Sequence, residues 1–148
     1  KDRMASVALH LHQQLVNDGK VCLFAGCDGY ADGEQRRDFI HVDDVVAVNL
    51  WLLDHPHCNG VFNVGTGRSH SFNDVAKAVI DWHGGGELHY IPFPDDLVGR
   101  YQSFTEADIT ALRRVGYEAD FVDVPTGVVR YLDWLKSGNV DVVKTLYA

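Results

Sequence analysis

The sequence has few cysteines, no long apolar run and no secretory leader, and each absence narrows the kind of protein that it can encode. Its three cysteines, Cys22, Cys27 and Cys58, are odd in number and lack metal-binding spacing. This favours reduced thiols in a cytosolic protein over a disulfide framework. No apolar run approaches the roughly 18 residues of a membrane span, and the first residues do not form a signal peptide. We therefore expect a cytoplasmic protein without a membrane partner.

Positive charge is also scarce. Lysine and arginine total 13 against 21 aspartates and glutamates, so the formal net charge is -8. A nucleic-acid partner is not expected, because such a surface normally shows a basic stripe. A small anionic ligand remains compatible with this balance, since a few local arginines can bind it. The length of 148 residues suits one domain with a real core.

Complete catalytic machinery is missing from the sequence. There is no G-x-S-x-G motif, and none of the six tyrosines is followed by lysine four positions later. Gly65-Thr66-Gly67 resembles the start of a dinucleotide fingerprint, but His70 stands where the third glycine should fall. The acidic residue expected about 20 residues later is also absent. We interpret this segment as a tight turn in which Asn63 and Thr66 make local backbone bonds.

Apolar spacing predicts alternating helices and short strands. A doubly wound domain would show longer Val/Ile-rich strands, so we predict a small mixed α+β lobe of the α/β class, without a Rossmann sheet, that packs against something else. The helix from Asp43 or Asp44 to Leu53 is apolar on most sides and should be buried on most sides. Ser71 should cap a helix with Asp74 in an imperfect capping box. The predicted helices span 4–17, 44–53, 72–83, 106–115 and 125–135, the predicted strands 21–24, 38–42, 61–64 and 88–91, and the tail after Gly138 should be frayed.

Two arginines, Arg36 and Arg37, follow a glycine- and aspartate-rich loop over 26–33. The planar guanidinium makes two parallel bonds to phosphate, and Asp38 could orient one of the arginines. A surface Arg–Asp pair of little energetic weight is an equal alternative. Arg100-Tyr101 offers a second cation beside an aromatic ring, which suits a nucleotide or sugar, or ordinary loop packing.

The remaining polar candidates lie near the first helix and in one loop. His10 is either a satisfied helix histidine or a ligand contact. Lys1 and Arg3 stand at a helix N-terminus, where the dipole disfavours cations, so they indicate either a ligand or a solvated end. His55, His57 and Cys58 suit an exposed loop better than a metal site, and we predict no metal.

Several blocks together resemble the extended short-chain dehydrogenases that act on nucleotide sugars, within the NAD-dependent epimerase/dehydratase superfamily. The stretches Lys1–His10, Leu50–Leu53 and Gly99–Thr105 narrow the resemblance to the ADP-heptose 6-epimerases of lipopolysaccharide core assembly. It extends from Lys1 to about Leu135 and corresponds to the C-terminal half of such an enzyme. The blocks are Met4-Ala5-Ser6-Val7-Ala8, Arg37-Asp38-Phe39, Asp44-Val45, Asn63-Val64-Gly65-Thr66-Gly67 and Tyr90-Ile91-Pro92-Phe93-Pro94.

The resemblance implies that residues 1–148 form a substrate-binding lobe and that an NADP-binding Rossmann domain is absent. It implies an isomerase that inverts C6 of ADP-heptose by transient oxidation, forms homo-oligomers and is inactive as this chain alone. Lys1 matches one of the two acid/base residues; the other, a tyrosine, is missing. Two alternatives remain: the lobe of another nucleotide-sugar epimerase or dehydratase, and a non-catalytic binding module.

The resemblance also implies a set of substrate contacts. Arg3 and His10 match first-helix positions that face the sugar nucleotide. Phe24-Ala25-Gly26-Cys27 matches a stretch usually written F-x-G-S, with cysteine in place of serine, so that a hydroxyl contact is lost there. Arg37 matches the substrate-contacting arginine, and Tyr101 matches the loop tyrosine.

Overall fold

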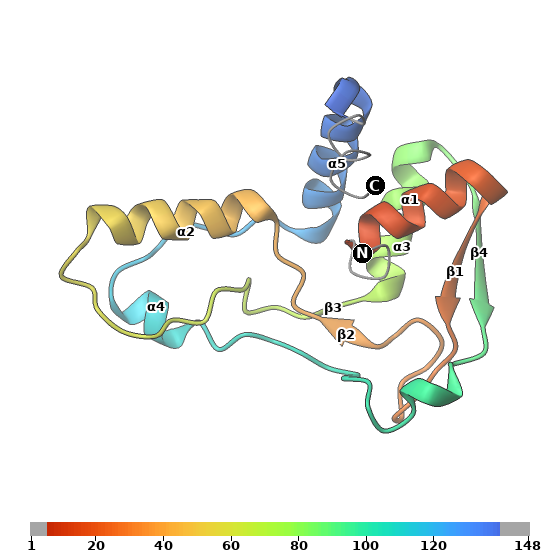
Figure 1. Cartoon of the computed structure of the whole chain (residues 1–148), viewed down its shortest axis with the longest axis horizontal. Coiled ribbons are helices and arrows are strands. Elements are labelled where there is room, and N and C mark those ends of the chain that lie inside the picture. Colours follow the sequence, from red (N-terminus) through yellow and green to blue (C-terminus); the bar gives the residue numbers. More distant parts are fainter. Residues whose placement is uncertain (1–5, 140–148) are drawn as a thin grey trace.

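The computed structural model describes residues 6–139 and contains helices arranged around two very short sheets (Figure 1). One sheet pairs β1 with β4 in parallel, from Lys20 opposite Glu87 to Phe24 opposite Ile91. The other pairs β2 with β3 in antiparallel register. The elements are α1 (Val7–Asp18), β1 (Lys20–Phe24), β2 (Arg36–Arg37), α2 (Val42–Asp54), β3 (His70–Ser71), α3 (Phe72–His83), β4 (Glu87–Ile91), a 3-10 turn (Asp95–Leu97), α4 (Thr110–Arg114), α5 (Val124–Trp134) and a final irregular turn (Leu135–Asn139).

The larger core lies where α1, α3 and α5 pack together beside the β1–β4 sheet. Val21 of β1 and Val79 of α3 are completely buried, as is Leu132 of α5. Figure 1 shows these elements gathered on one side of the molecule. The prediction of a small mixed α+β lobe is confirmed, and the parallel pairing of β1 with β4 is a finding of the structure.

Several helix ends follow the predicted chemistry. The Ser6 hydroxyl accepts from the Leu9 amide, and α1 ends at Gly19 in the left-handed conformation. Ser71 and Asp74 form a full capping box, with reciprocal bonds of 3.1 and 3.0 Å. Asp123 caps α5, with Pro125 in its first turn. The predicted tail beyond Asn139 lies outside the described residues.

A second, smaller core joins α2 to α4. Val48 and Leu112 are completely buried and contact Tyr117. The carboxylate of Asp44, which is also buried, accepts a 2.9 Å hydrogen bond from the Val122 amide. This bond ties α2 to the segment that leads into α5.

The expectation that the second helix is buried on most sides is wrong. Its buried face carries Val48, while an apolar stripe at helical spacing faces outward, and Leu53 in this stripe is 75% exposed. No segment of residues 6–139 covers the stripe, which explains why an all-round apolar pattern did not produce all-round burial. The apolar stripe consists of Val42, Val46, Leu50 and Leu53.

Three predicted elements differ from the structure. Residues 38–42 are not a strand; pairing ends at Arg37, and the His41 ring caps α2 by accepting from the Asp43 amide. Residues 61–64 are extended but find no paired strand among the described residues, and Val61 is 94% exposed. The predicted 106–115 helix shortens to α4, since the Asp108 side chain accepts from the Thr110 amide and starts the helix late.

The Asp38 carboxylate joins three segments that are distant in sequence. It accepts from the Thr66 amide (2.8 Å), the Thr66 hydroxyl (2.6 Å), the Gly67 amide (2.9 Å) and the Ala107 amide (3.0 Å). Burial raises the pKa of Asp38, but the hydrogen bonds from Thr66, Ala107 and Gly67 outweigh it and lower the pKa below its ordinary value. Asp38 therefore orients a glycine turn, and the expectation that it orients an arginine is wrong.

No helix within residues 6–139 is both long enough and apolar enough to cross a bilayer.

Asp38→Asn is expected to lower the free energy of unfolding at neutral pH by about 1–2 kcal/mol, because an amide cannot accept all four bonds. Since the folded-state pKa is lowered, the carboxylate's contribution is complete above the ordinary value of about 4 and disappears as the pH falls through the folded-state pKa. Urea unfolding across this range measures the effect. Asp54→Asn, at an exposed helix end, is the control; equal stability of both variants at neutral pH would contradict the role given to Asp38.

Candidate functional site

The candidate site is built around the guanidinium of Arg37, at the end of β2. Its carbon lies 4.8 Å from the Tyr101 ring centroid and 5.9 Å from that of Phe72. One of its nitrogens donates to the Arg36 carbonyl at 2.9 Å. Within residues 6–139 it forms no ion pair with a carboxylate. Arg37 is thus held by aromatic rings, and its charge stays available to an anion.

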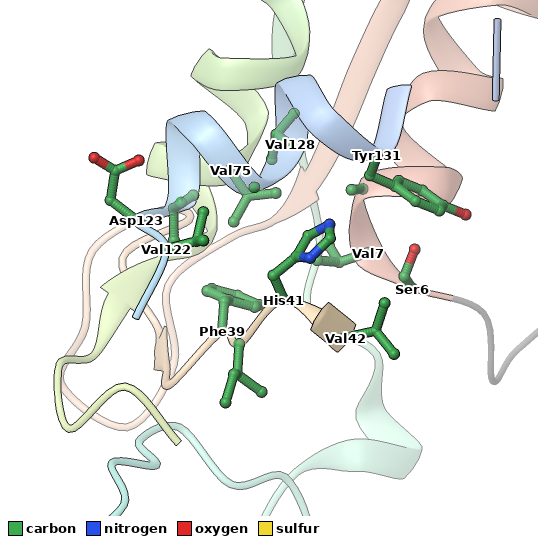
Figure 2. Close-up of a pocket in the computed structure, with 14 residues that line it drawn as sticks. Ser6, Val7, Phe39, His41, Val42, Val75, Val122, Asp123, Val128 and Tyr131 are labelled. Carbon is green, nitrogen blue, oxygen red and sulfur yellow. The ribbon is translucent and has the colours of Figure 1, made fainter. Parts of the chain in front are cut away.

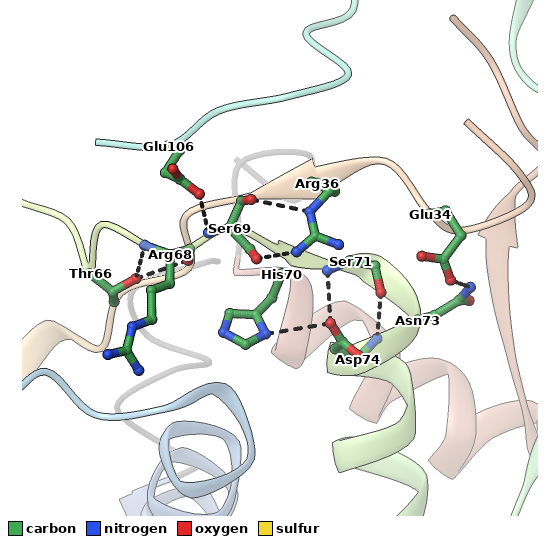
Figure 3. Close-up of polar contacts among 10 residues, drawn as sticks. All are labelled: Glu34, Arg36, Thr66, Arg68, Ser69, His70, Ser71, Asn73, Asp74 and Glu106. Carbon is green, nitrogen blue, oxygen red and sulfur yellow. Dashed lines mark hydrogen bonds and ion pairs between the residues drawn. The ribbon is translucent and has the colours of Figure 1, made fainter. Parts of the chain in front are cut away.

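Arg36 has a different task. Its guanidinium donates to both the hydroxyl and the carbonyl oxygen of Ser69, and the Ser69 amide donates to Glu106 at 2.8 Å (Figure 3). Successive side chains of a strand point to opposite faces, so β2 directs one arginine into the fold and the other to the site. The choice of Arg37 over Arg36 as the ligand contact stays a prediction.

Aromatic rings form a wall beside Arg37. Tyr101 meets Phe93 edge to face at 5.3 Å, and Phe93 meets Phe24 in the same way at 5.5 Å. Burial raises the pKa of Tyr101, and the nearby charge of Arg37 only partly opposes this. Tyr101 therefore stays a neutral phenol at physiological pH and can donate a hydrogen bond to a ligand.

The loop after β1 is fixed from within. The Gly26 amide donates to the Asp32 carboxylate at 2.7 Å, and the Gly33 amide donates to the Phe24 carbonyl at 3.1 Å. A Cβ added at Gly26 would lie 2.2 Å from the Tyr30 carbonyl oxygen, so only glycine fits there. Gln35, only 2% exposed, donates its side-chain amide to the Ala25 carbonyl at 2.9 Å. The loop backbone is thus set before any ligand arrives.

Four of the predicted site residues come together. Phe24, Cys27, Arg37 and Tyr101 lie in one continuous cluster, because the rings link Phe24 to Tyr101 through Phe93 and the Cys27 sulfur lies 3.6 Å from the hydroxyl of Ser103, two residues after Tyr101. Ala25 and Gly26 supply the loop backbone between Phe24 and Cys27.

His10 is not linked to this cluster by any of the hydrogen bonds, ion pairs or ring contacts found within residues 6–139. His10 lies half-buried on α1, and its ligand contact stays a prediction. Lys1 and Arg3 lie outside the described residues. Arg100 is exposed and Arg37 takes the place over Tyr101, so Arg100 is not the cation of the aromatic pair.

Sequence reasoning missed Phe72, Phe93 and Gln35 as parts of the site. Phe93 sits between two prolines in the motif Pro92-Phe93-Pro94, a signal of a rigid, specifically placed side chain that could have been used. Gln35 directly precedes the two arginines, but nothing in the local sequence predicts that this polar side chain is buried.

A separate apolar cavity of about 250 Å³ lies between α1, α5 and residues 39–42 (Figure 2). Within residues 6–139, the polar lining is limited to Ser6, His41, Asp123 and Tyr131, with no arginine or lysine among these described residues. Such a lining suits an apolar group and not a diphosphate.

The histidine loop at residues 55–58 shows no sign of a metal site. The His55 ring stacks on the Trp51 ring, with 4.0 Å between ring centroids, and is hydrogen-bonded to the Trp51 carbonyl. No group of three potential metal ligands occurs within residues 6–139.

Comparison with known proteins gives consistent matches. A family model described as the NAD dependent epimerase/dehydratase family matches residues 1–65. The chain is 58% identical over 133 residues to an ADP-L-glycero-D-manno-heptose-6-epimerase of Alkalilimnicola ehrlichii, covering 90% of the chain and 42% of that protein. A protein of the same name from Thiobacillus denitrificans is 51% identical over 150 residues, covering 91% of the chain and 45% of its own length.

A solved structure of Helicobacter pylori ADP-L-glycero-D-manno-heptose-6-epimerase aligns with a TM-score of 0.72 at 25% identity, covering 91% of the chain and 39% of that structure. The chain spans less than half the length of the curated relatives it matches. Over that part of their length, the chain is similar in sequence to proteins named ADP-L-glycero-D-manno-heptose-6-epimerase.

Gly26→Ala is expected to destabilise the protein by about 1–3 kcal/mol, because its Cβ would collide with the backbone of Tyr30 and Ala31. Gly127→Ala is the matched control: its Cβ meets nothing closer than 3.6 Å, and alanine in α5 should stabilise by about 0.5–1 kcal/mol. Thermal unfolding of both variants tests the pair. A Gly26→Ala variant as stable as Gly127→Ala would show that the loop is not closely packed.

Proposed function

We propose that this chain forms the sugar-nucleotide pocket of an ADP-heptose 6-epimerase that serves lipopolysaccharide core biosynthesis. The observation that carries the proposal is the Arg37 guanidinium, stacked on Tyr101 and without a carboxylate partner in the described part of the chain. A rigid, uncompensated guanidinium beside a neutral phenol suits the diphosphate of a sugar nucleotide. The names of the curated relatives supply the identity of the nucleotide sugar.

In the proposed complex, Arg37 donates two parallel hydrogen bonds to phosphate oxygens. The Tyr101 ring holds the guanidinium in place, so little rotamer entropy is lost on binding. Phe93 and Phe24 close one side of the site and exclude water, which strengthens the charge-assisted bonds. Cys27, Ala25 and Gly26 present the loop to the sugar side of the ligand.

The proposed epimerisation inverts C6 of the heptose by transient oxidation, the chemistry that a bound NADP supplies. The turn at residues 65–67 does not fit that cofactor. At the turn resembling a dinucleotide fingerprint, the amides of Thr66 and Gly67 already donate to Asp38, so they are not available to a pyrophosphate. We propose that NADP binds to a part of the native protein outside this chain, and that Lys1 serves there as an acid/base residue, with Arg3 and His10 near the substrate.

The apolar stripe supports the proposed division into domains. A contiguous exposed apolar face normally marks an interaction surface, and the apolar cavity adjoins the stripe at Val42. We propose that residues 1–148 are a substrate-binding lobe and that a nicotinamide-binding domain of the longer protein covers this face. A cytoplasmic homo-oligomer without nucleic-acid or membrane partners belongs to the same proposal.

Arg37→Ala in the native protein is expected to weaken ADP-heptose binding roughly 10- to 100-fold, because a phosphate would lose its charge-assisted partner. Arg37→Lys should recover only part of this affinity, since a point charge cannot bind bidentately. Isothermal titration calorimetry measures both. Arg114→Ala removes an exposed arginine of α4 and is the control. An unchanged dissociation constant for Arg37→Ala would contradict the proposed phosphate contact and leave Arg37 with a structural role.

The 148-residue chain purified by itself is expected not to convert ADP-heptose, because the turn that resembles a dinucleotide fingerprint already donates its Thr66 and Gly67 amides to Asp38. A coupled assay with added NADP compares it with the native protein. Turnover by the isolated chain, with no other polypeptide present, would contradict the assignment of cofactor binding to another part of the protein.

A further inference from the structure

A second polar group of side chains adjoins the Arg37 cluster. The Ser103 hydroxyl donates to the Asp28 carboxylate and lies 3.6 Å from the Cys27 sulfur. Ser103 also follows Tyr101, the ring under Arg37, by two residues. Ser103 and Asp28 therefore lie at the edge of the same site, and neither is part of the proposed diphosphate contact.

Backbone contacts hold this pair in place. The Arg36 amide donates to the Ser103 carbonyl at 2.9 Å, and the Thr105 amide donates to the Arg36 carbonyl at 3.1 Å. Ser103 is thereby bonded to β2, which also carries Arg37. On the other side, buried Gln35 donates to the Cys27 sulfur at 3.4 Å. The pair is thus fixed relative to the arginine without any ligand.

The backbone of Asp28 adopts an uncommon conformation. Its φ of 52° lies in the left-handed region, where it is the only non-glycine residue within 6–139. Aspartate tolerates this conformation better than most residues. Non-glycine residues in this region gather at functional sites, and here the conformation brings the carboxylate to Ser103.

The chemistry of the pair suits hydroxyl groups. A serine that donates to a carboxylate keeps its lone pairs as acceptors, and the carboxylate offers further acceptor sites. A set of acceptors recognises hydroxyl donors and repels phosphate oxygens. Arg37, a pure donor, has the opposite preference. The two groups together match a ligand with an anionic part and an adjoining polyol.

We propose that Ser103 and Asp28 bind hydroxyl groups of the sugar in the pocket, next to the diphosphate held by Arg37. This rests on the proposed function and adds to it a sugar side of the site. The Cys27 sulfur touches the Ser103 hydroxyl, so a serine at position 27 would place a hydroxyl within the same space. Cys27→Ser should therefore compensate for the loss of Ser103.

The test compares binding of ADP-heptose and of ADP to the native protein by calorimetry. Ser103→Ala and Asp28→Asn are each expected to weaken ADP-heptose binding about tenfold, the effect of one lost hydrogen bond to a charged or fixed partner. ADP binding should not change. Ser103→Thr, which retains the hydroxyl, and the double variant Ser103→Ala/Cys27→Ser should both recover most of the affinity.

Each contrary outcome has one meaning. Wild-type affinity for ADP-heptose in Ser103→Ala overturns the sugar contact and leaves the proposed function intact. Equal losses for ADP and ADP-heptose overturn it as well, because a general disturbance of the loop would weaken both. No binding of ADP-heptose by the wild-type native protein overturns the proposed function together with this inference.

Discussion

The carboxylate of Asp38 is the interaction on which the arrangement of the site depends. It follows directly after Arg37 and receives hydrogen bonds from the turn at Thr66 and Gly67 and from the amide of Ala107. Three segments without long regular structure thereby share one anchor. Gly65 allows this approach, because a Cβ there would lie 2.6 Å from the carboxylate. A carboxylate that accepts several hydrogen bonds is rarely exchanged without cost, so the half-buried Asp38 fixes where β2 ends.

The short strand β2 carries two arginines with different roles. The Arg36 guanidinium is hydrogen-bonded to Ser69 inside the fold, whereas the Arg37 guanidinium lies over the Tyr101 ring at the site. Because the 99–105 segment is bonded to the same strand through Ser103 and Thr105, the Arg37 guanidinium and the Tyr101 ring are held next to each other. The loop after β1 completes the site, with Gln35 as its internal support. Preorganisation of this kind reduces the entropy lost on ligand binding.

Local signals predicted the parts of this fold that depend on local chemistry. The cap at Ser71 and the start of the last helix near Pro125 follow from side chains within a few residues. The choice of Arg37 came from the family resemblance, because the residue chemistry alone favoured a phosphate-binding arginine and a surface Arg–Asp pair equally. What failed depends on distant partners: residues 61–64 have strand composition but no strand beside them in the described chain, and Asp38 bonds residues up to 69 positions away. The apolar stripe belongs to the same class, because an apolar pattern specifies burial without specifying the covering surface.

A structure of the native protein with ADP-heptose bound is the most direct measurement of the central claim, which is that Arg37 holds the diphosphate of a sugar nucleotide. The account predicts phosphate oxygens within hydrogen-bonding distance of the Arg37 guanidinium, with Tyr101 still beneath it. Diphosphate bound elsewhere, with Arg37 contacting only Tyr101 and Phe72, would contradict it.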